Sequence, residues 1–164
     1  MARSSVTLRG FRELDRALKD LPKATARGVL VRTAVKAMEP MRRKMAELAP
    51  YDENDRDGDG RHLRDTIRTQ NVAGKVARKL ARRFGTVDRD AGVVVLTGPA
   101  PQGGRALTNA YWQEFGTKRM PANAYVRPAA DAESDTVFRI VEEELGRQIE
   151  KSLSRLAKRA AKGR

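Results

Sequence analysis

The sequence predicts an α+β fold in which a small antiparallel sheet packs against two to three helices, and a long helix ends the chain. Apolar residues recur at helical spacing near both ends, whereas β-branched residues gather in two short central segments. Aromatic residues make up only 5% of the 164 positions, so Ala, Val, Leu, Ile and Met must form most of the core, which favours helices. The length suits a single domain, residues 1–164.

Two helical stretches open the chain. Apolar residues at helical spacing run from Phe11 to Leu21, and Pro22 follows directly, so a short amphipathic helix should end there. A second helix is predicted from about residue 23 to residue 48. Pro40 lies inside it and should kink it or split it in two.

The central part alternates between predicted loops and strands. Residues 50–62 are rich in Asp and Gly, so we expect a mobile loop. A strand is predicted from Leu63 to Val72 and a second one at 93–96, the latter from three Val and one Leu in a row. The segment between them, 74–90, is a basic insertion that would form either a short amphipathic helix or a hairpin arm. Residues 98–106 hold several Gly and Pro and predict another mobile loop.

The C-terminal third is predicted to be mostly helical. A short helix should span 107–115 and end at Gly116, with an extended stretch over 121–128. One amphipathic helix of about 45 Å should then run over 129–160, because apolar residues recur every three or four positions. These residues are Val137, Val141, Leu145, Ile149, Leu153, Leu156 and Ala160. Its end, 147–164, is basic.

The residue inventory argues against most catalytic and metal chemistry. The chain has no Cys and one His, His62, which excludes a disulfide framework, a thiol nucleophile and multi-His metal sites. Residues 55–60 match the first half of a calcium loop, with Asp at alternate positions and a closing Gly. Thr66 stands where the bidentate carboxylate is needed, so we interpret this stretch as a loop. We expect no cofactor and no enzymatic activity.

The termini and the lack of a long apolar segment predict a protein that is soluble when made, in a cytoplasm or its equivalent, with no membrane contact. The N-terminus lacks the apolar run of a secretory signal. Charges interrupt every segment before the roughly 20 apolar residues of a bilayer span are reached.

The net charge predicts an anionic partner. Thirty-four Lys and Arg against 21 Asp and Glu give a formal charge of +13. Two segments concentrate it: Lys75, Arg78, Lys79, Arg82 and Arg83, and Arg147, Lys151, Arg155, Lys158 and Arg159. These residues would either contact DNA phosphates in a salt-sensitive way or form a solvated face or a docking surface for an acidic protein. Aromatic residues that accompany base stacking are missing from both segments.

Two neighbouring stretches carry a family resemblance. One is Tyr111-Trp112-Gln113-Glu114-Phe115-Gly116-Thr117, and the other is Pro121-Ala122-Asn123-Ala124-Tyr125-Val126-Arg127-Pro128-Ala129. Together with Leu-Pro at 21–22, Ala-Pro at 49–50 and the 60–67 segment, they resemble the gene-product-10-type tail-component family of long-tailed phages. The basic segment after residue 74 is longer than the usual turn of that family, and Ala124-Tyr125 stands where the family often has Pro-Phe.

The resemblance implies a structural virion protein rather than an enzyme. Members are neck proteins, described as head–tail joining, tail-completion or tail-terminator proteins. The implied assembly is a homo-oligomeric ring, six-fold, between the head connector and the tail tube. It would contact the adjacent head-completion (stopper) ring and the tail-tube or tail-terminator ring, and packaged double-stranded DNA would pass through it. The alternative from composition is a basic DNA- or RNA-binding module of the nucleoid type.

The resemblance also assigns roles within the two stretches. Phe115 would fill the core, Gly116 would adopt a positive φ at the helix end, and Thr117 would begin an extended segment. Arg127 precedes a proline and is therefore expected to be extended, with its side chain paired to Glu114 or to an adjacent subunit. Whether these stretches contact another subunit or only specify the fold stays open. The candidates for such contacts are Tyr111, Trp112, Glu114, Phe115, Gly116, Thr117, Arg127 and Pro128.

Overall fold

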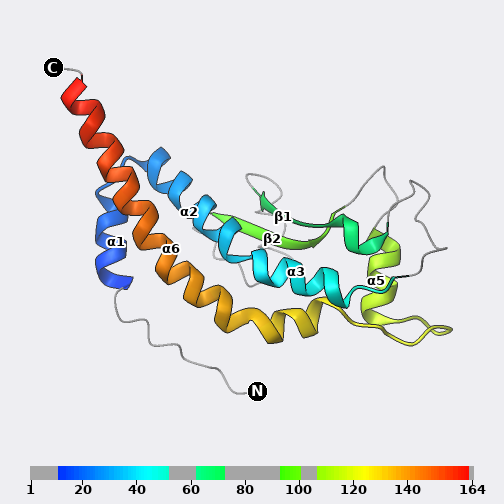
Figure 1. Ribbon diagram of the computed structural model, residues 1–164. Helices are drawn as coiled ribbons and strands as arrows, with labels where there is room; N and C mark the ends of the chain where they lie inside the picture. Colours follow the sequence, from blue (N-terminus) through cyan, green and yellow to red (C-terminus); the bar gives the residue numbers. More distant parts are fainter. Residues whose placement is uncertain (1–10, 52–61, 73–92, 101–106, 163–164) are drawn as a thin grey trace.

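The computed structural model describes residues 11–51, 62–72, 93–100 and 107–162, and these confirm the predicted α+β architecture (Figure 1). A two-stranded antiparallel sheet packs against helices, and the longest helix runs along the N-terminal helices. The elements are α1 (Phe11–Lys19), α2 (Lys23–Ala37), α3 (Glu39–Leu48), the 3₁₀ turn η1 (Leu63–Thr66), β1 (Ile67–Val72), β2 (Val94–Pro99), α5 (Leu107–Phe115) and α6 (Val126–Lys162).

Prolines set the boundaries of the N-terminal helices, as predicted. Pro22 precedes α2 with a non-helical ψ of 136°. The helix predicted over 23–48 is split at Met38, which ends α2 and precedes α3, so Pro40 falls in the first turn of α3. A proline is tolerated there because the first-turn N–H groups have no intrahelical partner.

The first strand begins later than predicted. Residues 63–66 form a 3₁₀ turn, and the strand β1 starts only at Ile67. The Thr66 hydroxyl donates to the Leu63 carbonyl over 2.7 Å, and both residues are buried. A local side-chain hydrogen bond of this kind competes with strand pairing, which explains the shorter strand.

The second strand ends later than predicted, so the assignment of residues 98–100 to a mobile loop is wrong. Gly98 pairs with Arg68 and Pro99 with Ile67 in the antiparallel register. Ala100 is buried, and its N–H donates to the Thr66 carbonyl over 3.0 Å. Proline is compatible with this position because it ends the strand. The rest of that loop, 101–106, lies outside the described residues. So do residues 52–61 and residues 73–92, which include the basic insertion at 74–90.

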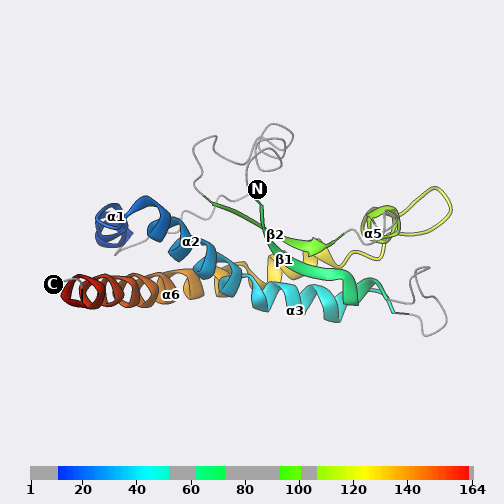
Figure 2. The same ribbon diagram turned by 90° about the horizontal axis from the view of Figure 1, so that it is seen from above.

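Helix α6 is longer than predicted and connects the two ends of the fold. Its 37 residues correspond to about 55 Å, and it starts at Val126 instead of Ala129. Helices α2 and α3 follow one another along it (Figure 2), and the sheet lies on the side of α3 away from α6 (Figure 1). One core cluster lies near the start of α6 and contains Met45, Ala49, Leu63, Ile67, Ala110, Tyr125 and Ala129. The other lies near its middle and contains Leu21, Val29, Leu145 and Ile149.

The predicted apolar face of α6 is only partly buried. Leu145 and Ile149 are buried, but Leu153 is 42% exposed and Ser152 takes its place in the interior. The reason is geometric: each step of four residues turns the helix by about 400°, so a stripe with steps of four drifts about 40° per step around the axis. Which residues of α6 are buried therefore depends on where the other helices pack against it.

A polar contact ties α2 to α6. Lys36 Nζ lies 2.7 Å from Glu144 Oε2, and Gln148 Nε2 lies 2.9 Å from Glu144 Oε1. The Lys36 hydrogen bond, followed by that of Gln148, holds the pKa of the buried Glu144 below its ordinary value. None of the described helices has the length and apolar character that a bilayer crossing requires.

Candidate functional site

Helix α5 turns one polar side chain inward and three aromatic side chains outward. Ala110 and Glu114, four residues apart, are buried. Tyr111, Trp112 and Phe115 are 61%, 48% and 55% exposed. The Tyr111 and Phe115 rings lie 4.7 Å apart, centroid to centroid. We call these three residues the α5 aromatic patch; α5 lies at the end of the molecule opposite the C-terminus (Figure 1).

The exposure of Phe115 corrects the expectation that it fills the core. The buried ring is that of Tyr125, which is fully buried against the first core cluster. Arg127 covers one face of Phe115 instead, with its guanidinium carbon 5.1 Å from the ring centroid. On a helix, Phe115 lies about 100° from Glu114, so when Glu114 faces inward Phe115 cannot.

Glu114 faces inward because its carboxylate caps α6. Its Oε2 accepts the N–H groups of Tyr125 and Val126, each over 2.8 Å. Its Oε1 accepts the N–H of Arg127 over 3.2 Å and the Arg127 Nε over 2.9 Å. The next residue, Pro128, has no N–H. The unpaired donors at the start of α6 are thus satisfied by one side chain from another helix.

The surroundings of the Glu114 carboxyl favour its charged form. Burial alone would raise the pKa of Glu114, but the N–H of Val126, the Arg127 guanidinium and the N–H of Tyr125 outweigh it and lower the pKa below its ordinary value. A carboxylate also interacts favourably with the dipole at a helix N-terminus. The predicted ion pair between Glu114 and Arg127 is therefore confirmed within the chain, at 2.9 Å.

The expected extended conformation of Arg127 is wrong, because Arg127 lies in the first turn of α6. The restriction that a following proline imposes is only a preference. Here the cap from Glu114 compensates for it. The sequence did contain a signal for this start: Pro128 occupies the first turn, where proline is common.

Gly116 links the α5 helix to the α6 cap and has the predicted positive φ, 74°. A Cβ at this position would lie 2.8 Å from the Ala122 nitrogen and 2.9 Å from the Met120 oxygen. The expectation that Thr117 begins an extended segment is wrong, because Thr117 opens a tight turn. Its N–H donates to the Met120 carbonyl over 2.8 Å, and its hydroxyl accepts the Met120 N–H over 3.1 Å. This turn returns the chain close enough for Tyr125 to reach Glu114.

Tyr125 is the site residue that the sequence reasoning did not single out. Its hydroxyl is buried and has no hydrogen-bond partner among the described residues. Burial, with a smaller contribution from the Glu114 charge, raises its pKa to about 12. The neutral phenol is therefore the form present under physiological conditions, and the ring acts as a core side chain.

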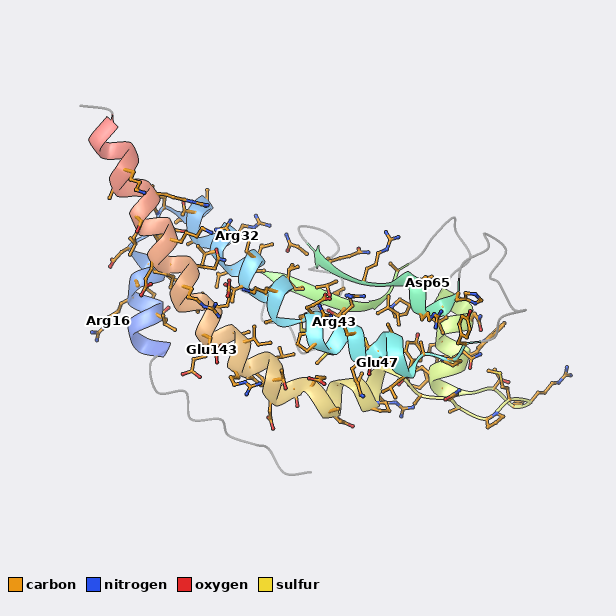
Figure 3. The ribbon with its side chains drawn as sticks, viewed as in Figure 1. Arg16, Arg32, Arg43, Glu47, Asp65 and Glu143 are labelled. Carbon is orange, nitrogen blue, oxygen red and sulfur yellow. The ribbon has the colours of Figure 1, made fainter. Side chains whose placement is uncertain are left out.

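Four of the five basic candidates on α6 lie on the outside of the protein. Arg147, Lys151, Arg155 and Lys158 are exposed, and Arg159 lies in the same helix. Figure 3 shows that charged side chains also extend outward from α1, α2 and α3, among them Arg16, Arg32 and Arg43. The other five basic candidates, from Lys75 to Arg83, lie outside the described residues.

The described part of the chain offers no group of His, Cys, Asp or Glu that could hold a metal ion. The calcium-like stretch at 55–60 lies outside it. His62 is half-buried against Tyr51, with ring centroids 4.3 Å apart, and the Arg64 guanidinium carbon lies 3.7 Å from the Tyr51 centroid. Comparison with protein-family models, curated proteins and solved structures finds no match for this chain.

Proposed function

We propose that the chain is a structural subunit of the neck of a phage or phage-like gene transfer particle, where copies form a ring that joins the head connector to the tail tube. Packaged double-stranded DNA would pass through this ring. The proposal covers both layers of the neck, tail completion and tail terminator.

The observation that carries the proposal is the α5 aromatic patch. The whole chain has only one Trp, three Tyr and four Phe, and three of these rings lie exposed on one nine-residue helix. Exposed clusters of large apolar side chains mark interaction surfaces, and Trp and Tyr dominate the energetics of protein interfaces. The patch belongs to the same stretch that resembles the tail-component family.

The rigid attachment of α5 supports an assembly role. The Glu114 cap, the Gly116 turn and a hydrogen bond of 2.8 Å from the Asn123 N–H to the Gln113 carbonyl fix α5 to the start of α6. A patch held in this way loses little conformational entropy when it binds a neighbour. Such preorganisation strengthens a contact between subunits.

The test is to locate the chain in particles and to remove one ring from the patch. Particles made by cells that express a tagged chain would be imaged by electron microscopy. Trp112→Ala would be compared with Tyr51→Ala, which removes an exposed aromatic ring outside α5. We expect the tag at the head–tail junction, and detached heads and tails with Trp112→Ala only. Absence of the tag from particles, or normal particles with Trp112→Ala, would refute the proposal.

The second candidate is a basic nucleic-acid-binding module, favoured by the exposed Lys151, Arg155 and Lys158 along one side of α6. It predicts tight binding of bare duplex DNA that weakens steeply as salt rises, since each neutralised phosphate releases counterions. A chain that is absent from particles and binds DNA at physiological salt would establish this function in place of the first.

A further inference from the structure

The first half of α6 carries a stripe of exposed acidic and apolar side chains. Asp131, Asp135, Phe138 and Glu142 follow one another in steps of four, three and four residues, so they share one side of the helix. All four are exposed, and the Phe138 ring is 50% exposed. We call them the acidic stripe. Within the described residues, none of its three carboxylates takes part in an ion pair.

The second half of α6 carries a matching basic stripe. Arg147, Lys151, Arg155 and Lys158 follow in steps of four, four and three, and all are exposed. Arg147 is paired within the helix, at 3.3 Å from Glu144 and 3.8 Å from Glu143. The other three have no ion-pair partner in the part of the chain that the structure describes.

The two stripes match in length but lie on opposite sides of the helix. Each spans 11 residue steps, or about 16 Å, and their starting points are about 24 Å apart along the axis. At about 100° per residue, the centres of the two stripes lie roughly 180° apart around the helix. Both face away from the body, because α3 packs on the first half and α2 and α1 on the second (Figure 2).

Each half of α6 keeps the sign of its stripe when all charged residues of that half are counted. Residues 131–143 hold five acidic residues and one basic residue, Arg139. Residues 147–162 hold six basic residues and one acidic residue, Glu150. Glu143, at the end of the acidic half, also points away from the body (Figure 3). One helix therefore presents two surfaces of opposite charge, and Arg147 is the one member of either stripe that the described residues pair within the helix.

We propose that the acidic stripe of one copy binds the basic stripe of the next copy. Opposite charges of equal length make the second copy the fitting partner, and Phe138 would supply the apolar contact in the middle. A two-fold antiparallel pair of α6 helices would need both stripes on the same side. Their opposite placement instead gives head-to-tail association, which forms a ring when the rotation closes and a filament when it does not. The inference deepens the proposed function and rests on it for ring closure.

The test uses two charge-reversed chains. In the first, Asp131, Asp135 and Glu142 are changed to Lys; in the second, Lys151, Arg155 and Lys158 are changed to Glu. Each chain alone carries two stripes of the same sign and should self-associate at least about tenfold more weakly than the wild type, by sedimentation velocity. An equimolar mixture should recover association, because every contact then joins opposite charges. Circular dichroism checks that each variant is folded.

Controls separate this interface from a general charge effect. Asp20, Glu47 and Asp65 are also exposed, so changing these three to Lys gives the same change in net charge away from α6 and should leave association unchanged. Wild-type association should weaken from about 0.1 M to about 1 M salt, where the Debye length falls from about 10 Å to about 3 Å.

The outcomes distinguish this inference from the proposed function. A wild-type chain that stays monomeric at low salt, or reversed chains that associate like the wild type, would overturn the stripe contact. A mixture that does not recover association would also overturn it. So would a chain with the reversed basic stripe that loses DNA binding but associates like the wild type. None of these results bears on whether the chain lies at the head–tail junction, which imaging of particles decides. Conversely, recovery in the mixture would support the stripe contact even for a chain that is absent from particles.

Discussion

Removing the carboxylate of Glu114 should destabilise the fold more than any other single change on α5. Glu114→Ala leaves the N–H groups of Tyr125, Val126 and Arg127 without their acceptor. It also releases the Arg127 guanidinium, which is 60% exposed and can be hydrated again. The damage should therefore come mainly from the backbone donors at the start of α6.

The magnitude follows from those contacts. Loss of a helix N-cap costs about 1 kcal/mol, and each hydrogen bond to a charged group contributes about 1.5–3 kcal/mol. Because the bonds act together and Arg127 is solvated, we expect Glu114→Ala to lower the free energy of unfolding by about 2–4 kcal/mol. Glu114→Gln keeps the shape and one acceptor oxygen, so about 1–2 kcal/mol is expected.

Urea unfolding of the wild type, Glu114→Ala and Glu114→Gln as a function of pH measures both effects. The pKa of Glu114 lies below its ordinary value of 4.5 in the folded state. The stabilisation by its charge is therefore fully present above the unfolded pKa and is lost as the pH falls through the lower, folded pKa. The difference between the wild type and Glu114→Gln should be constant near neutral pH and shrink below pH 4.5.

A variant of Arg127 tests whether Glu114 stabilises the fold mainly through the backbone N–H groups of the cap. Arg127→Ala removes the guanidinium but keeps the backbone N–H, so the buried Glu114 carboxylate retains three of its four hydrogen bonds and the variant should cost clearly less than Glu114→Ala. A free energy of unfolding for Glu114→Ala within about 0.5 kcal/mol of the wild type, the spread of ordinary surface substitutions, would refute the reasoning. So would a difference from Glu114→Gln that grows in acid.

Three further substitutions test neighbouring parts of the structure by the same unfolding measurement. Gly116→Ala should cost at least about 2 kcal/mol, because a Cβ adds strain at a positive φ and meets two backbone atoms within 3 Å; a cost below about 1 kcal/mol would contradict that turn. Tyr125→Phe should raise the free energy of unfolding by about 1 kcal/mol, since it removes a buried hydroxyl that has no partner among the described residues, and a decrease would reveal a partner. Phe115→Ala should cost about 1 kcal/mol or less, because the ring is 55% exposed, whereas a buried Phe would cost about 3–5 kcal/mol.

Local chemistry in the sequence was enough to predict the break in the second helix and the turn at Gly116. Pro40 split the second helix because it lacks an N–H, and Gly116 took the positive φ that a side chain disfavours. The long last helix followed from its apolar spacing. In each case the determining group lies in the residue itself or close by in the chain.

Tertiary structure decided which side of each element is buried. Spacing places Glu114 and Phe115 on different sides of α5, but it does not say that the free N–H groups at the start of α6 turn Glu114 inward and leave Phe115 exposed. The same holds for Ser152 and Leu153 on α6. Burial depends on partners from distant segments, because a polar side chain is buried only where donors or acceptors meet it. Those partners are brought together only when the whole chain folds.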